Sequence, residues 1–423
     1  MKVIEARCVS GSGIVRQQIR FDENTGLITD VGQLGVSRSD LSFYYEDECL
    51  LFAGMGDIHI HAREDVSQKN CYKEDFCSAH EAMINGGVTH AGDMPNNPIP
   101  PVDDQSYLAK LKLTEKVNGD IWTYAGIGPG TQPLSFKVPY KVYMGPSIGE
   151  LFFKDLPTLD QALARYKNQW VSFHCEDPEI LESHKAEKTH EERRPVKAEV
   201  VATADALMLI EKYGLHGKLC HYSSGEGLNL IRAARKKGQK IFIEVTPQHL
   251  YYSIDELKDK EHKLFQMNPP IRGNKDKDEM LKALLEGEID FLATDHAPHT
   301  MEEKEKGISG LTGLDTFGPF VTWLILEKKI SPELIAKVTA ERPGDFFNEF
   351  LPSWKKYLPA YEKYGAGLGH ILPGYRASFT VLNMKKPLLI SKQNLKTKVG
   401  HSPFEGVTFP GSVESVFIGG QKA

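Results

Sequence analysis

Short apolar runs alternate with longer, charged helical patterns through the middle of the chain, and this alternation limits the possible folds most strongly. The pattern NLIRAARKKGQ is followed by KIFIEVTP, and DEMLKALLEGE is followed by IDFLATD. Strand–helix alternation over roughly 300 residues predicts βα units that share a parallel sheet. That length is typical of a (β/α)8 barrel of the TIM type with insertions, so we expect an α/β fold of this kind.

Both chain ends have a different sequence pattern, which predicts strands and turns in place of helices. The stretch VRQQIRFDENTGLITDVG alternates around a DENTG turn and predicts a hairpin, and HILPGYRASFTVLNM and GVTFPGSVESVFIGG near the other end look alike. We expect the two ends to form one small β-sandwich domain that places the termini together. The predicted division is residues 1–53 and 371–423 for this domain and residues 54–370 for the barrel.

The charge balance disfavours a nucleic-acid-binding protein, because 51 Lys and Arg against 57 Asp and Glu give a net charge of −6. A membrane protein is also disfavoured, since no apolar run approaches the roughly 18–20 residues that span a bilayer. The best candidate runs from Phe317 to Leu326. Glu5 and Arg7 stand where a signal peptide needs apolar residues, so we expect a cytoplasmic protein with its six cysteines reduced.

The segment GMGDIHIHAR would end a strand with two histidines on one face. Strand side chains alternate between two faces, so Asp57, His59 and His61 point to one side, and Ile58 and Ile60 to the other. Catalytic residues of such a barrel lie at the carboxyl ends of its strands, so this pair would aim two imidazoles at one spot, as a metal ion requires. Taken alone, the H-x-H pattern favours two ordinary polar residues.

Two further histidines end short apolar runs, His174 in QWVSFHCEDPE and His221 in KLCHYSSGEG. Alternation directs both histidines into the barrel and directs Cys175 and Cys220 outward against the helices. We therefore interpret both cysteines as packing residues. Each histidine alone is more often structural than a ligand.

An aspartate and a lysine are the other unusual inward residues. Asp295 ends the run IDFLATD, where a buried carboxylate without a cation or hydrogen bonds is costly, which favours function over packing. Lys141 lies in VPYKVYMGPS on the same face as Tyr143, where a buried ammonium must be neutralised or modified. Lys137, in a proline-flanked stretch, is expected to be exposed.

Six inward side chains on successive strands would share one site: His59, His61, Lys141, His174, His221 and Asp295. Unrelated coincidences do not explain six such residues together. Two divalent metal ions bridged by a carboxylated lysine would use all of them. Four imidazoles among the ligands favour zinc.

The order H-x-H, Lys, His, His, Asp resembles the amidohydrolase superfamily, and the finer motifs resemble the dihydroorotase family within it. DIHIHAR is similar to that family's D-x-H-x-H-x-R, DMPNN to its M-P-N-T turn, and GLTGLDT to its later glycine loop. EVTPQHL, QMNPPIR, ATDHAPH and PGYRASFTVLN resemble family patterns too, and the resemblance covers nearly the whole chain. It implies a metal-dependent hydrolase of cyclic amides, which interconverts N-carbamoyl-L-aspartate and L-dihydroorotate in de novo pyrimidine (UMP) biosynthesis.

The resemblance also implies a role for each matching residue. The implied metal ligands are His59 and His61 for one ion, His174 and His221 for the other, and Lys141 and Asp295. Lys141, as N6-carboxylysine, would bridge the ions together with a hydroxide. Asp295 would also act as general base and acid, which a carboxylate beside a reacting water can do.

The implied substrate-binding residues are Arg63, Asn96 and Asn268, with His299 helping. Arg63 offers a fork of donors that suits a carboxylate. An asparagine amide can both donate and accept, as the edge of an imide-like ring requires.

One part of the chain departs from the family pattern. Arg63 is followed by Glu64 to Val66 in place of Glu-Pro-Gly, and Lys73 to Asp75 arrive after a longer loop. Asn97 replaces the usual threonine of M-P-N-T. These differences bear on substrate affinity more than on metal binding.

Two alternatives stay open. A related cyclic amidohydrolase, such as an allantoinase or hydantoinase, would share the metal site but would not need a carboxylate-binding arginine, so Arg63 with Asn96 favours dihydroorotase. A catalytically silent subunit that scaffolds a transcarbamoylase would be expected to have lost metal ligands, which this chain keeps. A homodimer is the expected assembly, and a transcarbamoylase is the protein partner that the resemblance suggests.

Overall fold

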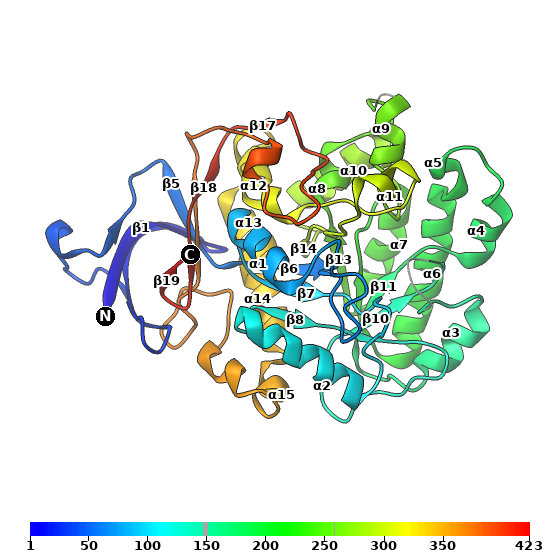
Figure 1. The fold of residues 1–423 in the computed structure, drawn as a ribbon, viewed down its shortest axis with the longest axis horizontal. Coiled ribbons are helices and arrows are strands. Elements are labelled where there is room, and N and C mark those ends of the chain that lie inside the picture. The colour runs from blue at the N-terminus through cyan, green and yellow to red at the C-terminus, as the bar shows by residue number, and fades with distance from the viewer. Residues whose placement is uncertain (147–150, 258) are drawn as a thin grey trace.

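Parallel strands in the middle of the chain close into a barrel, shown in a computed structural model that describes residues 1–146, 151–257 and 259–423 (Figure 1). The strands are β6 Met55–Ile60, β7 Val88–Asp93, β8 Ile121–Thr123 continued by β9 Ala125–Gly126, β10 Tyr140–Tyr143, β11 Trp170–His174, β12 His216–Leu219, β13 Ile241–Val245 and β14 Phe291–Leu292. One sheet runs β6–β7–β8 and the other β9–β10–β11–β12–β13–β14. They join where β8 leads into β9 and where Ile60 bridges His296 in parallel, so the predicted barrel is confirmed.

Helices cover the outside of the barrel (Figure 1). The longer ones are α1 Phe76–Asn85, α2 Asp104–Leu113, α3 Leu156–Leu163, α6 Val196–Tyr213, α7 Gly225–Lys236, α10 Asn274–Leu285 and α12 Phe317–Leu326. Shorter ones are α4 Pro178–His184, α5 His190–Arg193, α8 Pro247–Tyr251, α9 Asp259–Leu264, α11 Met301–Glu305, α13 Pro332–Ala336, α14 Arg342–Asn348 and α15 Leu351–Lys355. Residues 127–139, all of them described, connect β9 to β10 without a helix.

Local sequence signals explain where several of these helices begin. Asp75, Asp103 and Asp155 precede α1, α2 and α3, and each side chain accepts a hydrogen bond from a backbone N–H in the first turn. Such a cap satisfies a donor that the helix itself leaves unpaired. Every residue of β6 and β7 is buried, as expected for parallel strands that are covered on both faces.

The two chain ends share one eight-stranded sheet beside the barrel (Figure 1). Its strands are β1 Lys2–Ser10, β2 Gly13–Asp22, β3 Leu27–Gly32, β4 Phe43–Tyr44, β5 Cys49–Ala53, β15 Phe379–Asn383, β18 Ser412–Ile418 and β19 Gln421–Lys422. A separate hairpin pairs β16 Leu388–Leu389 with β17 Thr408–Phe409. The strand order is β19–β18–β15–β5–β1–β2–β3, with β4 beside β1, so β15 from the C-terminal part pairs with β5 from the N-terminal part.

This sheet curls until its two halves face each other. The rings of Phe21 on β2 and Phe379 on β15 lie 5.9 Å apart, and those of Phe43 on β4 and Phe417 on β18 lie 4.9 Å apart, although neither pair belongs to neighbouring strands. Both chain ends therefore build the small β domain with its own apolar core, as predicted. The exact boundaries at residues 53/54 and 370/371 stay a prediction.

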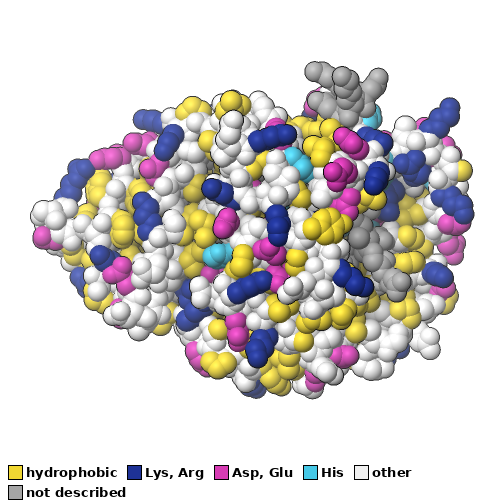
Figure 2. Space-filling view, in the orientation of Figure 1, with side chains coloured by type: hydrophobic (Ala, Val, Ile, Leu, Met, Phe, Trp, Pro, Cys, Tyr) yellow, Lys and Arg dark blue, Asp and Glu magenta, His cyan; other side chains and the backbone are white. Residues whose placement is uncertain are grey.

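The surface carries charges of both signs. Figure 2 shows basic and acidic side chains interspersed over one face of the molecule, as a net charge of −6 leads one to expect. Among the described residues, no helix combines the length and the apolar character that crossing a membrane requires.

Candidate metal and active site

The residues singled out from the sequence meet at the carboxyl ends of the barrel strands. A small cavity there is lined by His59, His61, Arg63, Asn96, Tyr143, His174, His221, Asn268, Asp295, Ala297, Ser309 and Gly310. Lys141 and His299 are buried beside this lining without being part of it. A barrel of this kind has its active site at this end, so location and residue chemistry agree.

His59, His61 and Asp295 form the first candidate set of ligands. Asp295 Oδ1 lies 3.3 Å from His59 Nε2 and 3.0 Å from His61 Nε2. His59 Nδ1 donates to a carboxylate oxygen of Glu244 at 2.5 Å, because a carboxylate can only accept. The lone pair of His59 Nε2 therefore faces a carboxylate oxygen, an arrangement that needs a proton or a cation between the two atoms.

The second candidate set is His174 with His221. His174 Nδ1 lies 3.0 Å from His221 Nε2, while His174 Nε2 lies 2.8 Å from Glu176. Burial opposes ionisation of Glu176, but the nearby Arg194 guanidinium and His174 hold the pKa of Glu176 at about 2. The Glu176 carboxylate thus fixes the ring of His174 from behind. Two imidazole nitrogens 3.0 Å apart are close enough to bind one ion at the usual zinc–nitrogen distance of about 2.0–2.1 Å.

Lys141 lies near both sets, and its amine is one of the polar groups of the site that lack a hydrogen-bond partner within the described part of the chain. It is fully buried, and its Nζ has no hydrogen-bond partner among the described residues. Lys218, a second lysine inside the barrel, differs because its ammonium contacts Glu244. A carbamate on Lys141 would carry a negative charge and oxygen ligands, so the surroundings fit a modified lysine that contacts cations better than a free ammonium.

Burial of this site favours the neutral form of its imidazoles. Burial lowers the pKa of His59 and His221 well below the usual histidine value, and the neighbouring Lys141 lowers both further. A neutral imidazole is the form that binds a metal ion. The residues therefore fit a pair of divalent cations.

The substrate side of the cavity holds Arg63, Asn96 and Asn268. Arg63 is only 4% exposed, and its Nε donates to the carbonyl of Pro298 at 3.2 Å. Asn96 accepts a hydrogen bond from His61 Nδ1 at 2.8 Å, so it also orients a candidate ligand. His299 does not line the cavity and instead contacts Arg63, with 3.1 Å between His299 Nε2 and Arg63 Nη2.

The residues that depart from the family pattern contact neighbouring parts of the structure and not the site cavity. Glu64 contacts Lys116 Nζ at 2.5 Å and accepts from the backbone N–H of Phe76 at 2.8 Å. Asn97 accepts from Lys110, whose Nζ also lies 2.6 Å from Asp93. Neither Glu64 nor Asn97 lines the cavity.

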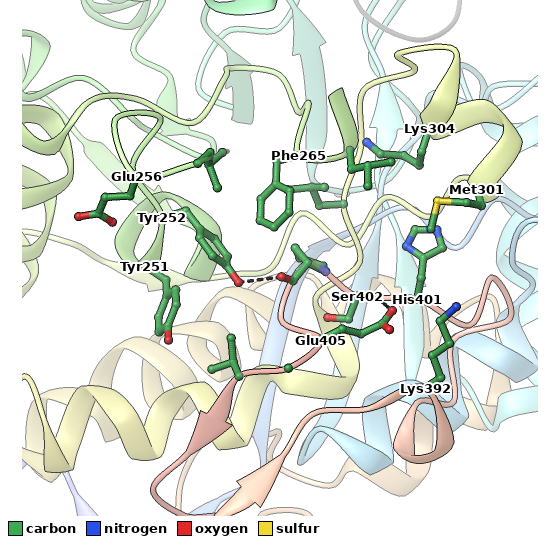
Figure 3. Close-up of a pocket in the computed structure, with 16 residues that line it drawn as sticks. Tyr251, Tyr252, Glu256, Phe265, Met301, Lys304, Lys392, His401, Ser402 and Glu405 are labelled. Atoms are coloured by element: carbon green, nitrogen blue, oxygen red, sulfur yellow. Dashed lines mark hydrogen bonds between the residues drawn. The ribbon is translucent and has the colours of Figure 1, made fainter. Parts of the chain in front are cut away.

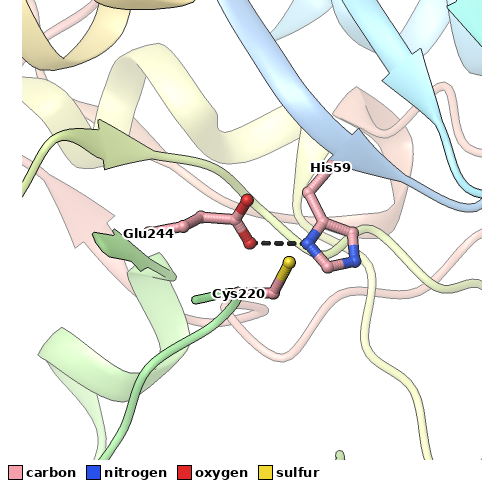
Figure 4. Close-up of side chains that lie close together, drawn as sticks. All are labelled: His59, Cys220 and Glu244. Carbon is pink, nitrogen blue, oxygen red and sulfur yellow. Dashed lines mark hydrogen bonds and ion pairs between the residues drawn. The ribbon is translucent and has the colours of Figure 1, made fainter. Parts of the chain in front are cut away.

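One prediction about side-chain direction is wrong. Cys220 does not pack outward, since its Sγ lies within 4.8 Å of ligand atoms of His59 and Glu244 (Figure 4). Strict alternation fails at His221, whose φ of 38° is left-handed, so neighbouring residues both turn toward the site. Cys175 lies in the apolar core, as predicted.

Left-handed backbone recurs where other site residues leave their strands. Arg63 has φ 63° and Asp295 has φ 48°. A non-glycine residue in this region is uncommon and costs of order 1 kcal/mol or more, which is found most often at functional sites.

Sequence reasoning did not single out Glu244, which organises this site. Its carboxylate contacts Lys218, His59 Nδ1 and the backbone N–H of His221, at 3.0 Å for the last. The available signal was a carboxylate inside the apolar run KIFIEV, because a charge in a buried strand needs partners.

Glu244→Gln is expected to destabilise the metal-free protein by roughly 3–5 kcal/mol, because Lys218 would become a buried cation without its partner. Urea unfolding would measure the loss. Adding Lys218→Met should recover most of it, because the unpaired charge then disappears. A double variant no more stable than Glu244→Gln would contradict this explanation.

A larger cavity than the site cavity, about 650 Å³, lies elsewhere in the described part of the chain (Figure 3). Tyr251, Tyr252 and Phe265 contribute to its wall, and Tyr252 donates to the carbonyl of Pro403 at 2.7 Å. None of the metal-ligand or substrate-binding candidates lines it. Residue chemistry, not volume, therefore identifies the site.

Known proteins resemble the chain along most of its length. No family model matches it. The dihydroorotase of Shouchella clausii is 30% identical over 88% of this chain and 86% of its own length, and that of a Geobacillus strain is 29% identical over 96% and 94%. Among solved structures, an L-hydantoinase from Arthrobacter aurescens matches with a TM-score of 0.86 at 22% identity over 99% of this chain and 95% of its own. A dihydropyrimidinase from Brevibacillus agri matches with a TM-score of 0.80 at 20% identity over 100% and 94%.

Proposed function

Because this chain belongs to the dihydroorotase family of metal-dependent cyclic amidohydrolases, we propose that it interconverts N-carbamoyl-L-aspartate and L-dihydroorotate in pyrimidine biosynthesis. The observation that carries the choice of substrate is the buried Arg63 in the wall of the site cavity. Nothing in metal chemistry requires an arginine there, whereas a ring that bears a carboxylate does.

The proposed cofactor is a pair of divalent metal ions, with zinc expected from the four imidazoles. His59, His61 and Asp295 would hold one ion, His174 and His221 the other, and Lys141 as N6-carboxylysine would contact both. Bound divalent ions polarise a carbonyl and lower the pKa of water to about 7. Elemental analysis of active, unchelated protein should find close to two ions per chain, and finding none would reject the proposed centre.

Asp295 is the proposed general base and acid. In ring opening it takes a proton from the water whose oxygen bonds to the ring carbonyl carbon, and it returns that proton to the nitrogen as the amide C–N bond breaks. Burial raises the pKa of Asp295 to about 7, although the nearby Lys141 opposes this rise. A carboxylate beside the reacting water can accept a proton in one direction and donate it in the other.

Arg63, Asn96 and Asn268 are the proposed substrate-binding residues. The guanidinium would pair with the ring carboxylate, and the two amides would face the polar edge of the ring. Such contacts hold the reacting carbonyl in one place, which is a major part of the rate gain in enzymes.

Arg63→Met is expected to lower kcat/KM for dihydroorotate by at least about tenfold, because a charge-assisted hydrogen bond contributes roughly 1.5–3 kcal/mol. The variant should keep its metal content, since Arg63 is not a proposed ligand. Steady-state kinetics in the ring-opening direction, with elemental analysis of the same sample, would measure both quantities.

The matched control is the native enzyme with uncharged rings. Its kcat/KM for dihydroorotate should exceed the values for dihydrouracil, hydantoin and allantoin. If an uncharged ring were turned over equally well, both the proposed role of Arg63 and the proposed substrate would fail, and a hydantoinase-like activity would take their place.

Homodimer formation, a complex with a transcarbamoylase and a cytoplasmic location remain further predictions for this chain. The alternative of a silent scaffold subunit is disfavoured by the complete set of proposed ligands. Light scattering of the purified protein would determine the oligomeric state.

A further inference from the structure

Glu303 on α11 connects the substrate side of the cavity to the loop that departs from the family pattern. Its Oε2 lies 3.1 Å from His299 Nδ1. Its Oε1 accepts from Tyr72 at 2.9 Å and contacts Lys73 Nζ at 2.8 Å. His299 Nε2 in turn lies 3.1 Å from Arg63 Nη2. A continuous set of polar contacts therefore runs from the loop to the arginine.

The proton positions along this set follow from its two ends. A guanidinium can only donate, so His299 Nε2 must be the acceptor toward Arg63. A neutral imidazole then carries its proton on Nδ1, which donates to the Glu303 carboxylate at 3.1 Å. The Lys73 ammonium also lies 3.3 Å from Nδ1, but it cannot accept a proton, so in this tautomer Lys73 donates to Glu303 instead. Burial lowers the pKa of His299 far below its usual value, and the adjacent Arg63 lowers it further, so the ring stays neutral.

The charge of Glu303 is maintained by its other neighbours. Partial burial raises the pKa of Glu303, but hydrogen bonds from Lys73 and Tyr72 more than offset this, and the net result is a lowered pKa. Each carboxylate oxygen thus has its own donors. Oε1 serves Lys73 and Tyr72, and Oε2 serves His299 and the backbone N–H of Thr300.

We propose that Glu303 is a positioning residue that acts through His299 to hold the Arg63 guanidinium against the substrate carboxylate. Lys73 and Tyr72, from the longer loop, keep the Glu303 carboxylate in place. The proposal rests on the carboxylate-binding role of Arg63 under the proposed function, and it gives His299 the further role of orienting Arg63.

Glu303→Gln tests this with little change in shape. The amide oxygen would remain with Lys73 and Tyr72, which only donate or prefer to donate, so the NH2 group would face His299 Nδ1. That contact favours the proton on His299 Nε2, where it opposes the donors of Arg63. The variant is expected to raise KM for dihydroorotate about tenfold with kcat changed less than about twofold.

A double-mutant cycle with Arg63→Met separates positioning from a general structural effect. Residues that act as one unit give non-additive losses, so Glu303→Gln should cost less than about twofold once Arg63 is gone. An equal loss in both backgrounds would overturn the proposal.

Glu303 also belongs to the capping box of α11, so the helix cap needs its own control. Thr300→Val removes the side-chain acceptor for the Glu303 N–H but leaves the Glu303 carboxylate facing His299. This variant should keep a native KM. A rise in KM equal to that of Glu303→Gln would assign the effect to the cap and overturn the proposal.

A measurement that needs no substrate can test the proposal even if dihydroorotate is not the substrate of this enzyme. Nitrogen-15 NMR of histidine-labelled protein distinguishes the two neutral tautomers of His299. The proposal expects the Nδ1–H form in the native protein and a shift toward Nε2–H in Glu303→Gln. An unchanged tautomer would overturn the positioning role, whereas a shifted tautomer without dihydroorotate turnover would overturn only the proposed substrate.

Discussion

Lys141→Ala is expected to lose bound metal and to lower turnover by at least about 100-fold, since even residues that only orient metal ligands cost 10–100-fold when changed. The physical reason is the position of Lys141, fully buried near two sets of imidazoles with no hydrogen-bond partner for its Nζ among the described residues. A carbamate there would supply oxygen ligands that alanine cannot. Metal content and ring-opening rate of the purified variant would measure the loss.

A small carboxylic acid added to Lys141→Ala should restore part of the activity, because it can enter the space of the missing carbamate. Lys137→Ala is the matched control. Lys137 is exposed, as expected from the sequence, and pairs with Glu349 at the surface, so its loss should change little. Normal turnover in Lys141→Ala would make Lys141 a bystander and would require another residue to bridge the ions.

Asp295→Asn is expected to lower kcat by about 10²–10⁴, the usual contribution of a general acid or base, because an amide cannot accept the proton. The fold should be retained, since the two side chains have nearly the same size. Circular dichroism would check the fold, and stopped assays in both directions would measure kcat.

The pH dependence of the native enzyme in the two reaction directions tests the proposed role of Asp295. Ring opening needs the ionised carboxylate, so its rate should rise with pH through the pKa of this group, while cyclisation needs the protonated form and should fall. The pKa of about 7 belongs to the metal-free site, and bound cations would stabilise the carboxylate and move both limbs to lower pH. The same pH dependence in both directions would exclude Asp295 as the proton carrier.

The barrel and the gathering of the site could be predicted because both follow from periodicity. Asp57 and His59 occupy alternate positions of β6 and His61 directly follows it, while Lys141 lies on β10, a parallel strand further around the same barrel. Carboxyl ends of parallel strands meet at one rim, so strand order together with alternation in β6, β10 and β11 was enough to bring His59, Lys141 and His174 together. The joining of both chain ends in one small β domain followed from their similar strand-and-turn patterns, and within that domain β5 pairs with β15.

Alternation could not predict what happens where a strand ends. His221 and Asp295 adopt a left-handed backbone conformation. No sequence pattern predicts this conformation for a non-glycine residue. This is why Cys220 and His221 both reach the interior. The role of Glu244 could not be predicted for another reason. Its partner Lys218 lies on a different strand, and only the folded barrel brings the two charges together.

The shared terminal sheet has a consequence for biosynthesis. Strand β5, Cys49–Ala53, is entirely buried and needs β15, Phe379–Asn383, along one edge. A ribosome adds about 5–20 residues per second, so this apolar edge waits on the order of 15–70 s for its partner while the barrel is still being made. An unpaired apolar edge strand is a template for aggregation. Chaperone demand during translation should therefore be concentrated on the first strands, and a premature stop codon after the complete barrel should yield an insoluble polypeptide even though every proposed ligand has already been synthesised.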